Sequence, residues 1–106
     1  MREGSNWSRI EVEAAVASYR EMLQLELAGA PFNKKQRNAD LQKVIGRNAG
    51  SIEFKHQNIS AVMVRLGLPW LRGYKPLSNF QAALVDGVER AGADGVTVGG
   101  HAIVER

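Results

Sequence analysis

Helix-capping residues and glycines divide the first two thirds of the chain into three segments. Each segment opens on a side chain that can cap a helix, namely Ser8, Asn33 and Ser51. Each closes near a glycine, namely Gly29, Gly46 and Gly67. Between cap and glycine, apolar residues recur three or four positions apart, which is typical of amphipathic helices. The pattern predicts a first helix from Ser8 to about Gly29, a second from Lys34 to Ile45 and a third from Ser51 to about Leu66.

The first helix carries the strongest local signal. Ser8 and Glu11 have the spacing of a capping box, in which each side chain accepts a hydrogen bond from the other residue's backbone amide. Trp7 and Val12, just outside this pair, have the spacing of a hydrophobic staple. We therefore expect the chain to enter its first helix here.

The third helix has one apolar stripe and an ambiguous opposite side. On a helical wheel the stripe consists of Ile52, Ile59, Met63 and Leu66. Lys55 and His56 flank the stripe on opposite edges. Phe54 and Ala61 fall nearly opposite it, so they either pack against a second partner or contact a ligand.

The rest of the chain predicts a loop, a fourth helix and a tail. Two prolines and a glycine interrupt residues 68–76, which should form an ordered loop. Ser78 can cap a helix through about Glu89 or Arg90, and residues 91–106 form either a short β-hairpin around Gly99-Gly100 or a disordered tail. We expect one mainly α domain over 1–106, a helix-turn-helix-like bundle of about four helices with its ordered core at about 7–90.

Composition excludes several functional classes. With 44% apolar and 24% charged residues, the chain of 106 should fold. It has no cysteine and two histidines, which is too few ligands for a structural zinc site, and no glycine-rich phosphate loop. We therefore expect neither an enzyme nor a cofactor. The sequence shows no transmembrane or signal segment, so we expect a cytoplasmic, nucleoid-associated protein.

Positive charge is concentrated in the middle of the chain. The net charge is only +3, yet residues 34–75 hold nine Lys and Arg against two Asp and Glu, a balance of +7. The segments on either side each have a balance of −2. A block of this kind can neutralise the phosphates of double-stranded DNA. The alternative is a solvated Lys/Arg-rich surface.

The second and third helices, joined by a short glycine-containing turn, match a helix-turn-helix unit. We expect the turn and the loop to contact phosphates, while the third helix reads bases through Ser51, Glu53, Lys55, His56, Gln57 and Asn58. The candidate DNA contacts are Lys34, Lys35, Arg37, Arg47, Asn48, Ser51, Lys55, His56, Gln57, Asn58, Arg72, Tyr74 and Lys75. Internal roles stay open: His56 and Asn58 could bond backbone groups, and Tyr74 could pack over the first helix.

A protein-protein adaptor is the alternative function. Trp70, Leu71, Tyr74 and Leu77 lie close together in and just after the predicted loop. If these side chains were exposed together, they would form an apolar patch suited to a protein partner.

The block RNAGSIEFKHQNISAVMVRLGLPWLRGYKPLSNFQ resembles the N-terminal head domain of McrA-type (ScoMcrA-like) modification-dependent HNH restriction endonucleases. With Trp7, Glu11, Tyr19, Met22-Leu23 and Leu41 upstream, the resemblance covers about residues 7–90. It implies a DNA-targeting domain that acts where foreign or modified DNA is recognised, with 5-methylcytosine as the candidate modification. The HNH metal site and its cysteine pairs have no counterpart here, so the resemblance implies recognition without cleavage.

Overall fold

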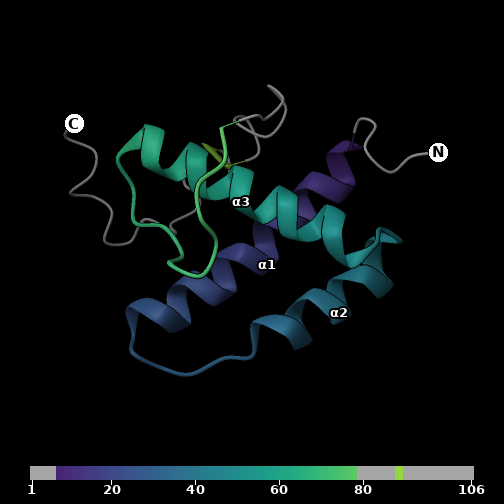
Figure 1. Cartoon of the computed structure of the whole chain (residues 1–106), viewed down its shortest axis with the longest axis horizontal. Coiled ribbons are helices and arrows are strands. Elements are labelled where there is room, and N and C mark those ends of the chain that lie inside the picture. The colour runs from purple at the N-terminus through teal and green to yellow at the C-terminus, as the bar shows by residue number, and fades with distance from the viewer. Residues whose placement is uncertain (1–6, 79–87, 90–106) are drawn as a thin grey trace.

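The computed structural model describes residues 7–78 and 88–89, and this part of the chain is mainly helical (Figure 1). Its helices are α1 (Arg9–Leu27), α2 (Lys34–Ile45) and α3 (Ala49–Leu66), and it contains no strand. Each helix contacts the other two. Of the predicted fourth helix only the cap Ser78 and residues 88–89 fall in this part, and residues 88–89 are helical. The rest of that helix and the predicted hairpin lie outside the described residues.

The start of α1 and both ends of α2 follow from their local sequences. The predicted capping box is present: Ser8 Oγ accepts from the Glu11 amide at 3.1 Å, and Glu11 Oε1 accepts from the Ser8 amide at 2.9 Å. At α2, Asn33 Oδ1 accepts from the Gln36 amide at 2.9 Å. Gly46 ends α2 with φ of +70°, a backbone conformation that a side chain would strain. The predicted bounds of α2 are confirmed.

The start of α3 differs from the prediction. The capping residue is Asn48, whose Oδ1 accepts from the Ser51 amide at 2.8 Å, so the helix begins at Ala49. Asparagine caps as well as serine does, and neither Ala49 nor Gly50 prevents a helical first turn. Ser51 therefore lies inside the helix and not at its cap. The predicted end at Leu66, followed by Gly67 in the left-handed conformation, is confirmed.

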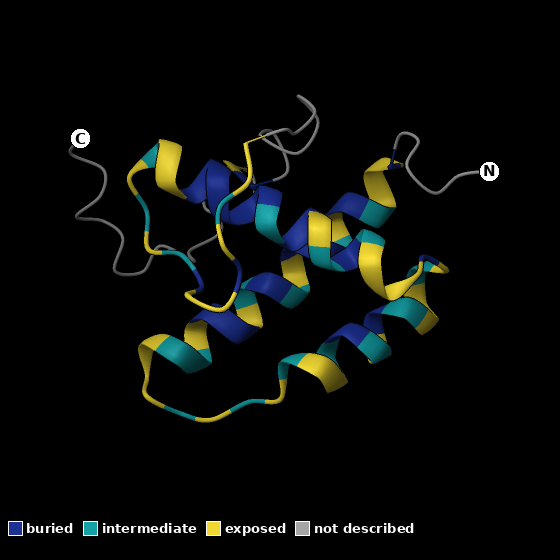
Figure 2. Cartoon of the chain, viewed as in Figure 1, coloured by how far each residue is buried: buried dark blue, intermediate teal, exposed yellow. Residues whose placement is uncertain are grey.

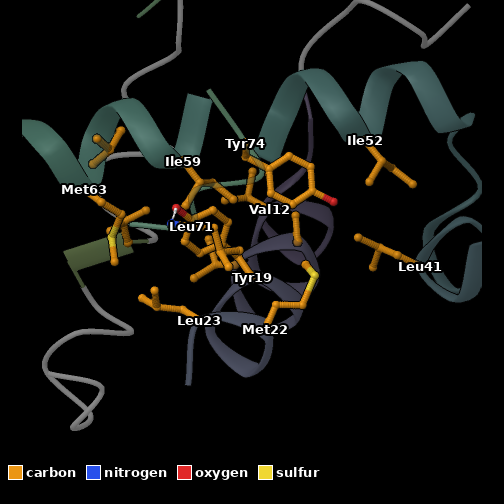
Figure 3. Packing of buried hydrophobic residues seen from close by; sticks show 14 of the residues in the cluster. Val12, Tyr19, Met22, Leu23, Leu41, Ile52, Ile59, Met63, Leu71 and Tyr74 are labelled. Carbon is orange, nitrogen blue, oxygen red and sulfur yellow. Dashed lines mark hydrogen bonds between the residues drawn. The ribbon is translucent and has the colours of Figure 1, made fainter. Parts of the chain in front are cut away.

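The core lies between α1 and α3, and Figure 2 shows buried positions along both helices. Both helices contribute the apolar stripes expected from their periodicity. Segment 67–78, which we call the strap, follows α3 and passes back over the helices (Figure 1). It contributes Leu71 and Tyr74, each 1% exposed, to the core (Figure 3). The strap is thus a structural part of the domain.

Hydrogen bonds fasten the strap to every helix. The Leu71 amide donates to Tyr19 Oη at 2.8 Å, and the Leu77 amide donates to the Gln57 carbonyl at 3.0 Å. From α2, Lys34 Nζ donates to the Gly73 carbonyl at 2.7 Å. These contacts join residues far apart in sequence, so they form only when the helices have assembled.

Tyr19 joins α1 both to α3 and to the strap. Its hydroxyl lies 2.7 Å from Ser60 Oγ and also accepts from the Leu71 amide. Burial raises the pKa of Tyr19 to about 12, so the hydroxyl keeps its proton at neutral pH. One phenol thus satisfies two buried polar groups.

Tyr19→Phe is expected to lower the free energy of unfolding by about 2 kcal/mol, because it leaves Ser60 Oγ and the Leu71 amide buried without this partner. Tyr74→Phe is the matched control, since the buried Tyr74 hydroxyl has no hydrogen-bond partner in the described part of the chain. Its removal should leave stability unchanged or raise it. Urea unfolding of both variants measures the difference, and equal losses would contradict this role for Tyr19.

Candidate nucleic-acid interface

Five of the predicted DNA contacts are buried in the domain: Tyr74, which is described below, and four polar residues. Arg47, Lys55, His56 and Asn58 are 3%, 6%, 0% and 1% exposed. A side chain that reads a base edge or holds a phosphate must reach the surface. In this fold these four residues do not, and their assignment as DNA contacts is corrected.

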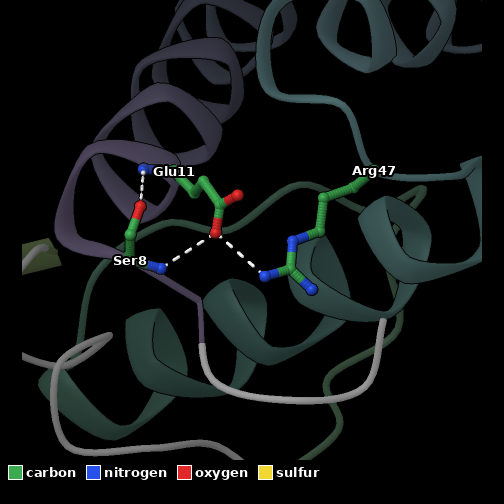
Figure 4. A network of polar contacts seen from close by, with 3 residues as sticks. All are labelled: Ser8, Glu11 and Arg47. Carbon is green, nitrogen blue, oxygen red and sulfur yellow. Dashed lines mark hydrogen bonds and ion pairs between the residues drawn. The ribbon is translucent and has the colours of Figure 1, made fainter. Parts of the chain in front are cut away.

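Arg47 lies in the turn between α2 and α3 and points back toward the start of α1. Its Nη2 donates to Glu11 Oε1 at 2.9 Å, and its guanidinium lies 4.8 Å from the centre of the Trp7 ring. Figure 4 shows that Glu11 Oε1 receives both this bond and the one from the Ser8 amide. The capping residue of α1 and the arginine expected to hold a phosphate therefore form one structural network.

Lys55 reaches the same tryptophan from α3. Its Nζ lies 4.9 Å from the centre of the Trp7 ring, so this ring is close to two cations. Burial, and secondarily the charge of Arg47, lower the pKa of Lys55. The sequence placed Lys55 on the edge of the apolar stripe, and the entry to α1 covers that edge.

His56 lies on the other edge, between α1 and the strap. Its ring centre is 5.9 Å from that of Tyr19 and 4.8 Å from that of Tyr74, the latter in an edge-to-face arrangement. Burial lowers the pKa of His56 to about 4; the Ala15 backbone opposes this shift, and Lys34 adds to it. His56 is therefore a neutral core residue at neutral pH.

Asn58 and Tyr74 have structural positions too. Asn58 Nδ2 donates to the Leu77 carbonyl at 2.6 Å and so fixes the strap to α3. Tyr74 is in the core, with the Lys34 ammonium 4.2 Å from its ring centre. Both residues therefore take the internal role that the sequence left open. Tyr74, like Asn58, is no longer a candidate DNA contact.

The apolar patch expected of an adaptor is not present. Leu71 and Tyr74 are buried, Trp70 is half-buried and only Leu77 is exposed. The side chains that would have anchored a protein partner are instead the part of the strap that completes the core. This removes the specific basis of the adaptor alternative.

The remaining candidates are at or near the surface. Lys35, Asn48, Arg72 and Lys75 are exposed, and Lys34, Arg37, Ser51 and Gln57 are half-buried. Arg37 Nη1 pairs with Glu21 of α1 at 2.6 Å, which offsets its charge. Asn48 caps α3 through its side-chain oxygen.

Four of these cations belong to two segments that meet, the first turn of α2 and the adjoining part of the strap. Lys34 bonds Gly73, and this contact places the neighbouring residues of the strap beside the first turn of α2. We call Lys34, Lys35, Arg72 and Lys75 the basic corner. Lys34 Nζ is 3.7 Å from Glu53, a pair with half-exposed side chains, and Arg72 stacks over Trp70 at 5.1 Å. Within the described residues, Lys35, Arg72 and Lys75 make no ion pair.

A groove of about 550 Å³ separates the basic corner from the beginning of α3. Its lining comes from one side of α2 and the first turn of α3: Lys34, Lys35, Asn38, Ala39, Gln42, Ala49, Gly50 and Glu53. Asn38 Nδ2 donates to the Ala49 carbonyl at 3.2 Å and so joins the two helices. Sequence analysis did not predict this groove. The signal that could have indicated it is the set of small residues Ala39, Ala49 and Gly50 in its lining.

The described residues contain no group of three or more His, Cys, Asp or Glu side chains placed to hold a metal ion. No helix in this part of the chain has the length and apolar character needed to span a bilayer.

Comparison of the chain with protein families, with curated proteins and with solved structures returned no match. The resemblance to McrA-type head domains therefore stays a prediction, and the function has to be inferred from the geometry of the chain itself.

Proposed function

We propose that this chain binds duplex DNA, without cleaving it, through the basic corner and the first two turns of α3. The observation that carries the proposal is that Lys34 and Lys35 of the basic corner line a groove whose other side is the exposed start of α3. In helix-turn-helix proteins the beginning of the second helix enters the major groove while neighbouring elements hold the phosphates. The arrangement of α2, the turn and α3 is compatible with that docking.

The charge balance supports a phosphate contact at this corner more than elsewhere in the basic segment. Arg37 and Arg47 are paired with acidic residues of α1, and Lys55 is buried. The first turns of α2 and α3 contain no acidic residue, so the partial positive charge of both helix starts adds to that of the lysines. A phosphate group at the groove would be attracted by both.

The proposed base-reading surface is smaller than the sequence predicted. With Lys55, His56 and Asn58 in the core, the predicted readers that keep exposed surface are Ser51, Glu53 and Gln57. Of these, Glu53 is paired with Lys34. A glutamine can make paired hydrogen bonds to adenine, and a serine hydroxyl can bond several base edges. Such a protein would act on DNA in the cytoplasm, at the nucleoid. A preference for 5-methylcytosine is part of the proposal only through the family resemblance, and competition between methylated and unmethylated duplexes tests it.

Lys35→Ala is expected to weaken binding to all duplexes by a similar factor, because a phosphate contact carries no sequence information. If each of the four cations meets one phosphate, log K should fall with log salt at a slope of roughly −3 to −4, and the variant should reduce the slope by about 1. Fluorescence anisotropy at several salt concentrations measures both quantities.

Arg65→Ala is the matched control. Arg65 is exposed and makes no ion pair within the described residues, but it lies at the opposite end of α3, about 24 Å along the helix from Ala49. Its removal should leave affinity and slope nearly unchanged. Equal effects of the two variants would indicate diffuse charge attraction, and the absence of salt-dependent duplex binding by the unmodified protein would overturn the proposed function.

A further inference from the structure

Phe54 is the only exposed aromatic side chain in the part of the chain that the structure describes. It lies in the second turn of α3 with 43% of its surface exposed. The sequence left two roles open for Phe54 and for Ala61: a second packing partner or a ligand. The structure separates the two residues, because Ala61 is only 9% exposed.

The position of the strap is consistent with the difference in exposure between Phe54 and Ala61. Leu77 bonds α3 twice, through the Gln57 carbonyl and the Asn58 side chain. These bonds bring the strap to the middle of the helix, whereas Phe54 lies about one turn closer to its start. The aromatic ring therefore remains on the same exposed helix start that we propose faces DNA.

Gln57 is the neighbour of Phe54 on this face. Residues three apart in a helix have Cβ atoms about 5–6 Å from each other, so the two side chains project together. The backbone oxygen of Gln57 is bonded to Leu77, but its side-chain amide makes no hydrogen bond within the described residues. An apolar ring and an amide with no hydrogen bond to the described residues thus stand side by side.

We propose that Phe54 and Gln57 together read A·T base pairs in the major groove, an inference that rests on the proposed function. In the major groove thymine presents its C5-methyl group, a partner for an apolar side chain, and adenine presents N7 and N6, a matching acceptor and donor for a glutamine amide. The spacing of the two side chains fits bases within one or two steps of each other, because bases along one strand are about 3.4 Å apart. A G·C pair offers neither the methyl group nor the adenine edge.

The test separates the two contacts chemically. Binding is measured on an alternating A-T duplex, on the same duplex with deoxyuridine in place of thymidine, and on one with 7-deazaadenine in place of adenine. Deoxyuridine removes only the methyl group, and 7-deazaadenine removes the N7 acceptor. We expect about a 4-fold loss of affinity from the first change, the equivalent of one buried methylene, and about a 10-fold loss from the second.

The variants assign each loss to a residue. Phe54→Ala should bind the thymidine and deoxyuridine duplexes equally but still discriminate against 7-deazaadenine, and Gln57→Ala should do the reverse. Circular dichroism and thermal unfolding check that both variants fold, which the exposed position of Phe54 and the half-buried position of Gln57 favour. If Phe54→Ala keeps the full response to deoxyuridine, or if the unmodified protein responds to neither base change, the A·T reading is wrong.

The proposed function has a separate readout. Salt-dependent binding to duplexes with no response to the base changes would overturn the A·T reading and leave the proposed function standing. No duplex binding at any salt concentration would overturn both, and would leave exposed Phe54 to be examined as a contact for a protein.

Discussion

Glu11→Ala is expected to lower the free energy of unfolding by about 3 kcal/mol, because it leaves the Arg47 guanidinium buried without its carboxylate. The Arg47 side chain is 1% exposed and that of Glu11 21%, so water can replace the lost partner only in part. The variant also removes the acceptor for the Ser8 amide in the capping box. Chemical denaturation measures the change.

Three further variants separate the contributions. Glu11→Gln keeps an acceptor for the Ser8 amide but removes the charge, so it should cost less than Glu11→Ala. Arg47→Met removes the buried charge itself and should cost less again, because no unpaired guanidinium remains. Glu13→Ala, which breaks an exposed pair with Arg9 on the same helix, should cost no more than about 0.5 kcal/mol.

The same variants test the corrected role of Arg47. If Glu11→Ala and Glu13→Ala were equally mild, the buried network would not be stabilising. If Arg47→Met kept full stability and lost DNA affinity, Arg47 would be the phosphate contact predicted from the sequence and its position in the fold would have to be revised.

Acid is expected to destabilise the protein through His56. The ring titrates near its ordinary pKa of 6.5 in the unfolded chain and at about 4 in the fold, so between these values the unfolded state binds more protons. The contribution of His56 to the free energy of unfolding should therefore be fully present above pH 6.5 and be lost as the pH drops. The expected loss is up to about 1.4 kcal/mol per pH unit and about 3 kcal/mol in total by pH 4. Urea unfolding across this range measures the slope.

His56→Gln is the diagnostic variant, because glutamine is polar and does not titrate. Whatever its free energy of unfolding at pH 7, this free energy should vary less between pH 6.5 and 4 than that of the unmodified protein. His101 is retained in the variant, so the difference between the two pH profiles reports on His56 alone. Parallel profiles would show that His56 is not held neutral in the core.

The local signals in the sequence determined the helices. A cap, a periodic apolar stripe and a terminal glycine act within a few residues, so Ser8, Asn33 and Gly46 could be interpreted correctly without knowledge of the fold. The misplaced start of α3 has the same local origin: Asn48 and Ser51 both cap well, and in the fold Asn48 is the cap.

The candidate site could be predicted only in part. Charge counting located the basic segment, and Lys35, Arg72 and Lys75 are indeed exposed. It could not show that Arg37 and Arg47 are matched by acids of α1, because those partners lie 16 and 36 residues away along the chain. A count along the sequence treats such cations as free when they are paired in space.

Tertiary structure alone decided which side chains face a ligand. The helical wheel of α3 identified its apolar stripe from the sequence, but Lys55 and His56 on the edges of the stripe were covered by elements distant in sequence, Trp7 on one side and the strap on the other. Periodicity encodes which residues of one helix share a face. Burial depends on what packs against that face, and those contacts exist only once the strap and the three helices have come together.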